Sequence, residues 1–259
     1  MRVKDVFAAL ERFAPLPLQD DFDNAGLQIG LTDGDNASGV LLCLDVTPAV
    51  LEEALSEGCN VVVSHHPLLF KPLKQIAGKT MVERCVQKAI SNNIAVYSAH
   101  TNLDNARGGV NFEIARRLGL TGVRFLRPQI GSDGGSGVIG ELEEPIAADE
   151  MLRLIGREFK ADRVCHNELL SRPIKRVALC GGAGDFLLED AISARADCFL
   201  TGEMHYHVYF GHEQEIQIAV IGHYESEQYT IDLMESLLTG ALPGLRVIKT
   251  SINTNPIEI

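Results

Sequence analysis

The chain has 259 residues and a formal net charge of −12 at pH 7, with 46% hydrophobic and 22% charged residues. This length allows a large core in one long α/β unit or in two lobes, and the composition is ordinary for a globular protein. The acidic charge argues against nucleic acid as a partner, because no cluster of Lys and Arg offsets it.

The first half of the chain alternates between predicted helices and strands. Residues 1–13 form an amphipathic helix, and a loop that contains Pro and Gly follows over 15–26. Apolar runs predict three buried strands, at 40–44, 61–66 and 94–98. Helices are predicted between and after them, at 47–57, 80–92 and 110–118. This alternation indicates a parallel, doubly wound sheet.

A second alternation follows the glycine-rich stretch 131–137, which marks a loop or a lobe boundary. Its predicted strands are 138–142, 176–180, 197–200, 216–221 and 245–249. Its predicted helices are 149–159, 185–195 and 225–238. The two halves have a similar order of elements but no residue-level repeat, and α/β alternation alone also explains this likeness. The pattern predicts an α/β protein with mostly parallel sheets.

The six cysteines are scattered, without a C-x-x-C pair, and most lie in apolar runs. This is typical of buried thiols in a reducing compartment. The N-terminal helix is not a signal peptide, and no apolar run approaches the ~20 residues that span a bilayer. We therefore expect a cytoplasmic protein with no membrane partner.

Three predicted strands end in side chains that can bind metals. His65 and His66 follow the run 61–64, and His100 and Asp104 follow the next strand. The third group, His223 and Glu227, follows the strand 216–221. Ligands of open parallel sheets bind at the carboxyl ends of the strands, so these side chains are the candidate site.

Each group also has a structural explanation. If the strand continues through His65 and His66, their side chains point to opposite sides of the sheet. One of the two is then explained as a histidine of the core. Asp104 suits a helix or turn cap. His100 lies four residues before it, and we expect one of the two to be a ligand and the other to line the pocket. A solvated helix face also explains Glu227, which lies four residues after His223.

Histidines mixed with carboxylates suit zinc, iron or manganese better than calcium or magnesium, which favour oxygen ligands. The absence of cysteine from the set argues against a closed structural zinc site. Five protein ligands for two metal ions leave open positions for water, as in two-metal hydrolases. The set therefore predicts two divalent metal ions.

Further polar groups follow other strands. The stretch Gly181–Gly184 precedes a helix, where it can cradle an anion or form a tight turn. It lacks the Lys and Ser/Thr of a P-loop. Glu203 ends another strand as a candidate pocket residue. His205 and His207 follow it, either as pocket or supporting residues or as plain surface residues.

Five motifs resemble, in order and spacing, those of the Nif-three-like dinuclear metal-centre family, whose members are often labelled GTP cyclohydrolase type 2 homologues. They are DNAGLQIG at 23–30, SHHP at 64–67, HTNLD at 100–104, TGE at 201–203 and GHYESE at 222–227. The resemblance covers nearly the whole chain, and the motifs are specific together rather than singly. Phe22 occupies the position where the family usually has Trp. This difference bears on the shape of the pocket wall and not on metal binding.

The resemblance implies a role for each member of the candidate set. His66 and Asp104 are implied ligands of one metal ion, and His65 and His223 of the other. Glu227 is the implied bridge between the two ions. Glu225 is its nearest rival, and only the motif match favours Glu227.

The resemblance also implies a fold and an assembly. The family has two α/β lobes with the metals near their junction, so the last helix and strand return to the first lobe. This gives a first lobe of 1–126 plus 220–259 and a second lobe of 127–219. The chain looks like the short form, without the domain that some members insert. The implied assembly is a toroidal homohexamer whose sites face an inner cavity.

The family label implies opening of the GTP ring by metal-activated water. No residue pattern here recognises guanine, and the acidic charge repels a triphosphate except where metals offset it. One hypothesis is a metal-dependent hydrolase, GTP cyclohydrolase-like or a phosphoesterase, that acts on a nucleotide or related small anion. The alternative is a non-catalytic metal-handling or protein-interaction scaffold. We prefer the hydrolase because two metals with open sites suit that chemistry.

Overall fold

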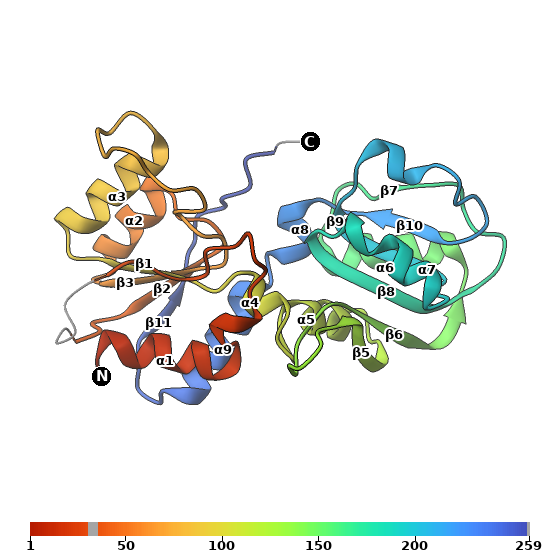
Figure 1. Cartoon of the computed structure of the whole chain (residues 1–259), viewed down its shortest axis with the longest axis horizontal. Coiled ribbons are helices and arrows are strands. Elements are labelled where there is room, and N and C mark those ends of the chain that lie inside the picture. Colours follow the sequence, from red (N-terminus) through yellow and green to blue (C-terminus); the bar gives the residue numbers. More distant parts are fainter. Residues whose placement is uncertain (31–35, 258–259) are drawn as a thin grey trace. The chain divides into compact units, whose positions relative to one another are not determined.

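The computed structural model describes residues 1–30 and 36–257, and the chain forms two compact units (Figure 1). Unit 1 contains Met1–Leu103 together with the C-terminal part of the described chain, from Thr230 onward. Unit 2 contains Asp104–Tyr229. Each unit has its own sheet and helices, which confirms the α/β class. The predicted lobe limits, and a metal site at the lobe junction, stay predictions.

Unit 1 is built on a five-stranded mixed sheet in the order β1-β4-β3-β2-β11. The strands are β1 (Gly26–Ile29), β2 (Val40–Cys43), β3 (Val61–Ser64), β4 (Ala95–Ser98) and β11 (Val247–Lys249). Neighbours pair in parallel except β1, which is antiparallel to β4. The three central strands are buried at every residue, which explains their continuous apolar sequences.

Helices cover both faces of this sheet. They are α1 (Val3–Phe13), α2 (Pro48–Ser56), α3 (Met81–Ser91) and α9 (Thr230–Ala241), with a 3₁₀ turn at η1 (Leu16–Leu18). In Figure 1, α2 and α3 lie together on one face, and α1 packs beside α9 on the other. The side chains of Thr47 and Thr80 cap α2 and α3, as a threonine before a helix predicts.

The C-terminal tail crosses the carboxyl edge of this sheet. Glu53 of α2 accepts hydrogen bonds from Thr250 and Ser251, directly after β11. Four residues beyond Thr250, the Thr254 hydroxyl donates to Asp45 Oδ2 at 2.7 Å. The tail thereby reaches the loop that follows β2.

Unit 2 has a six-stranded mixed sheet in the order β5-β6-β8-β9-β10-β7. Its strands are β5 (Thr121–Pro128), β6 (Gly135–Ile146), β7 (Cys165–His166), β8 (Ile174–Ala183), β9 (Cys198–Glu203) and β10 (Gln217–Val220). The predicted strands β8, β9 and β10 are parallel, and the outer pairings are antiparallel.

The glycine-rich stretch 131–137 belongs to the hairpin between β5 and β6. Gly135 is already in β6, where an added Cβ would lie 2.7 Å from the carbonyl oxygen of Arg127 on the facing strand. Only glycine, which has no Cβ, allows the two strands to approach so closely at this position.

The helices of unit 2 are α5 (Val110–Arg117), α6 (Ala148–Phe159), α7 (Leu188–Ser193) and α8 (His223–Glu227). Two 3₁₀ turns, η2 (Asp185–Leu187) and η3 (Tyr206–Tyr209), complete it, and the short helix α4 (Thr101–Asp104) spans the change from unit 1. Across the described ranges, no helix has the length and apolar composition needed to cross a membrane.

The predicted helix 225–238 is wrong as a single element, because it is divided between α8 and α9. Between them, Gln228 Nε2 donates to the carbonyl oxygen of Phe159, and the Tyr229 hydroxyl donates to that of Glu158. These bonds hold the intervening residues against α6, whereas α9 packs in unit 1.

Candidate metal centre

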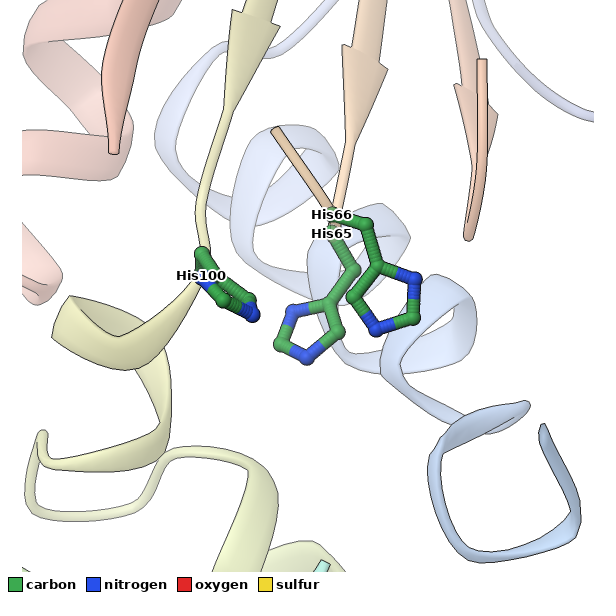
Figure 2. Close-up of side chains that lie close together, drawn as sticks. All are labelled: His65, His66 and His100. Carbon is green, nitrogen blue, oxygen red and sulfur yellow. The ribbon is translucent and has the colours of Figure 1, made fainter. Parts of the chain in front are cut away.

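Two neighbouring parallel strands deliver the histidines of unit 1 to one edge of the sheet. Ser64 at the end of β3 is opposite Ser98 at the end of β4, and their hydroxyl oxygens are 2.8 Å apart. The residues that follow therefore leave the sheet side by side. Figure 2 shows His65 and His66 beyond β3 and His100 beyond β4, with the three rings close together.

The three imidazole rings form a compact cluster. The ring centroids of His65 and His66 are 4.9 Å apart, and that of His100 lies 5.3 and 5.5 Å from them. One ring nitrogen from each residue lies within 4.8 Å of the other two. His65 is buried, while the other two are half-buried, so the cluster opens toward solvent on one side.

Hydrogen bonds at Nδ1 fix the tautomers of His65 and His66. His65 Nδ1 is 2.8 Å from the carbonyl oxygen of Ala99, and His66 Nδ1 is 2.8 Å from Asp45 Oδ1. Carbonyl and carboxylate oxygens accept hydrogen bonds, so each Nδ1 carries the hydrogen. The lone pair then lies on Nε2, as in histidines that bind metals.

His100 is oriented in the same way by Asp23, whose Oδ1 lies 2.7 Å from His100 Nδ1. The other oxygen of Asp23 accepts from the backbone N–H and hydroxyl of Thr101. Burial alone raises the pKa of Asp23, but the hydrogen bonds from His100 and Thr101 outweigh it and lower the pKa to about 2. Asp23 is therefore an ionised acceptor behind His100.

Asp45 supports His66 from the end of β2. Burial raises the pKa of Asp45, but the hydrogen bond and charge of His66, with the hydroxyl of Thr254, lower it below the usual value. The sequence did not predict the supporting role of either carboxylate, Asp23 or Asp45. The position of Asp45 beyond a predicted parallel strand was a usable signal, since it shares the edge with His65.

Asp104, the predicted partner of His66 on one metal, is the last residue of α4 and is half-buried. Its backbone oxygen accepts a hydrogen bond from Asn111 at 3.1 Å. The cluster in unit 1 instead contains His100, which the sequence suggested for the pocket. The role of Asp104 as a ligand stays a prediction.

His223 has two carboxylate neighbours in unit 2. Its Nδ1 is 2.8 Å from Oε1 of Glu203 at the end of β9, and its Nε2 is 3.1 Å from Oε2 of Glu227. Glu227 is 4% exposed, while Glu225 is half-exposed. The predicted pocket residue Glu203 is thus the residue that orients His223.

The glycines that end β8 do not form an anion cradle. The N–H of Gly181 donates to Asn111 Oδ1, and that of Gly182 to the hydroxyl of Ser226, so side chains of the protein use these donors. Gly182 has φ +60°, and an added Cβ would lie 2.4 Å from Glu227 Oε1. The glycine gives space to the carboxylate beside His223.

The other two predicted pocket residues lie on the surface of unit 2. The ring of His205 is exposed and its Nδ1 contacts the carboxylate of Asp185. His207 is exposed and lies against the rings of Tyr206 and Phe210. Neither contact assigns a function to these histidines.

The donor chemistry of the cluster in unit 1 fits divalent transition metals. Neutral imidazoles with Nε2 as donor suit zinc, iron and manganese. Support of each Nδ1 by a carbonyl or carboxylate is the arrangement that fixes metal-binding histidines. The cluster is able to hold metal ions.

Comparisons with known proteins show the family of this chain. Residues 1–256 match the family model described as Duf34/NIF3 (NGG1p interacting factor 3). A protein of Clostridium acetobutylicum named GTP cyclohydrolase 1 type 2 homolog is 35% identical over 260 residues, which cover 98% of this chain and 94% of that protein.

Solved structures share the fold. Staphylococcus aureus protein SA1388 has a TM-score of 0.91 at 24% identity, with 100% of this chain and 99% of that chain covered. A Bacillus cereus protein related to NIF3 has a TM-score of 0.88 at 23% identity over 99% and 98% of the two chains. At these identities the likeness concerns the fold alone.

Replacement of Asp45 tests the support of His66. We expect Asp45→Ala to weaken zinc binding by about 10- to 100-fold, because His66 loses the acceptor that fixes its ring. Competition with a chromogenic chelator measures the affinity. The control is Asp133→Ala, which removes an exposed partner of Arg107 in unit 2. Equal zinc affinity in Asp45→Ala and the wild type would contradict this role.

The lowered pKa of Asp23 predicts a pH dependence of stability. A carboxyl whose pKa falls on folding stabilises the fold above its unfolded value, near 3.8, and loses that contribution as the pH falls through about 2. The wild type should therefore exceed Asp23→Asn in unfolding free energy at pH 6, and the difference should shrink below pH 4. Urea unfolding of both proteins measures it. A difference that is constant with pH would refute the ionised pairing.

Proposed function

Because the chain belongs to the Duf34/NIF3 family, we propose that it is a metal-dependent hydrolase with a dinuclear centre, acting on a nucleotide or a related anion. The observation that carries the proposal is the cluster of His65, His66 and His100, whose Nδ1 atoms are all held by oxygen acceptors. Two zinc, iron or manganese ions are the proposed cofactors.

The proposed ligands follow the motifs. His66 and Asp104 would hold one ion and His65 and His223 the other, and Glu227 would be the ligand that they share. The orientation of His66 by Asp45 and of His223 by Glu203 supports the assignment of these two histidines.

The ions would supply Lewis-acid activation of water and charge stabilisation for an anionic substrate. The chain itself supplies a candidate proton acceptor in His100 Nε2. Asp23 orients this ring from the opposite side, where its Oδ1 lies 2.7 Å from His100 Nδ1. A histidine backed by a buried carboxylate is the pairing that general-base catalysis uses.

Turnover by metal-loaded protein tests the hydrolase. The wild type, loaded separately with zinc, manganese and ferrous iron, should hydrolyse at least one member of a panel of GTP and phosphate esters. His65→Ala should lower the rate by at least ~100-fold, because one ion loses a ligand. The matched control is His166→Ala, an exposed histidine of β7 that should retain full activity.

No turnover by any metal form would contradict the hydrolase. It would favour the alternative, a non-catalytic scaffold that handles metal or binds a protein partner. That alternative predicts metal uptake by the wild type without product from any substrate of the panel.

We also propose that the protein is a homohexamer, on the basis of its family resemblance. Light scattering at micromolar concentration should give about six times the 28.2 kDa mass of one chain. The mass should not change on dilution within the micromolar range, because an obligate assembly buries a large interface. A monomer at this concentration would refute the assembly.

A further inference from the structure

An aromatic surface adjoins the histidine cluster of unit 1. The rings of Phe22 and Phe70 are 6.4 Å apart at an angle of 63°, and Phe70 meets the ring of His100 edge-on at 6.2 Å. Phe22 is 68% exposed and Phe70 44% exposed. Two exposed aromatic rings in contact with each other, beside a candidate metal centre, are typical of a binding surface.

The loops that carry the two rings are fixed to each other. Asn24 Nδ2 donates to the carbonyl oxygen of Leu69 at 2.8 Å, and the N–H of Leu69 donates to Gln28 Oε1 at 3.1 Å. Asp23, next to Phe22 in the chain, is held by His100. Phe22 is thus next to the residue that orients His100, and Leu69, next to Phe70, is bonded to the same loop.

The segment that contains Phe70 is locally basic. Residues 67–80 include Lys71, Lys74 and Lys79 and no Asp or Glu, in a chain whose net charge is −12. Lys71 and Lys74 are exposed, and neither forms an ion pair within the ranges 1–30 and 36–257. Lys71 directly follows Phe70, so the Phe70 side of the aromatic surface has positive charge that can attract an anion, whereas Phe22 lies between Asp21 and Asp23.

We infer that Phe22 and Phe70 stack the base of a nucleotide, while Lys71 and Lys74 attract its phosphate. The inference rests on the proposed function, because it places the base beside the centre that acts on the nucleotide. A planar base stacks on an exposed aromatic ring face without specific hydrogen bonds. A nucleotide combines such a ring with the negative charge that these lysines complement.

Binding of guanosine monophosphate and ribose 5-phosphate separates the two parts of this site. Equilibrium dialysis is done with metal-loaded wild type and Phe70→Leu, with product formation followed in the same samples. The wild type should bind guanosine monophosphate at least ~10-fold more tightly than ribose 5-phosphate. Phe70→Leu should lose that preference and keep its affinity for ribose 5-phosphate.

Two controls separate stacking from indirect effects. Phe186→Leu removes a phenylalanine of similar exposure, 50%, from unit 2 and should keep the preference. The metal content of Phe70→Leu should equal that of the wild type, which excludes an effect through His100. The double variant Lys71→Gln/Lys74→Gln should weaken both ligands by a similar factor, because both carry phosphate.

Equal affinity of the wild type for the two ligands would overturn the inference, as would an unchanged preference in Phe70→Leu. A lower oligomer mass of Phe70→Leu with unchanged nucleotide affinity would show that a second copy of the chain covers the rings, which also overturns it. Base preference without turnover would contradict only the hydrolase. Turnover with no effect of Phe70→Leu on binding would contradict only the stacking site.

Discussion

The hydrogen bonds at histidine Nδ1 are the constraint on which the chemistry of this protein depends. Ala99, Asp45 and Asp23 each supply one acceptor, to His65, His66 and His100 respectively. An imidazole held in this way presents Nε2 in a fixed direction. The ring is already ordered when the protein folds, so metal binding does not lose the entropy of ordering it. The same bonds tie the loops before β1 and after β2 and β4 to one edge of the sheet.

The parallel order of β2, β3 and β4 explains why so much of the site was predictable. Buried parallel strands have continuous apolar sequences, and their carboxyl ends share one edge. The sequence therefore predicted that His65, His66 and His100 lie near one another without any knowledge of side-chain contacts. The resemblance to a metal-centre family, drawn from five short motifs, is confirmed by the match over residues 1–256.

What the sequence did not predict depends on contacts between distant residues. Asp23 precedes β1, which is antiparallel to β4, so its approach to His100 follows from a pairing that no periodicity indicates. The division between α8 and α9 results from tertiary hydrogen bonds of Gln228 and Tyr229, which override a continuous helical pattern. Gly182 was ambiguous for the same reason, because the Glu227 carboxylate that explains it is 45 residues further along the chain.

Anomalous diffraction from crystals of the as-purified protein, combined with metal analysis, tests the central claim most directly. The account predicts two divalent metal ions per chain, one bound by Nε2 of His65 and the other by Nε2 of His66, with Nδ1 of each ring still bonded to Ala99 and Asp45. Metal bound through either Nδ1, or metal-replete protein without an ion at these histidines, would contradict it.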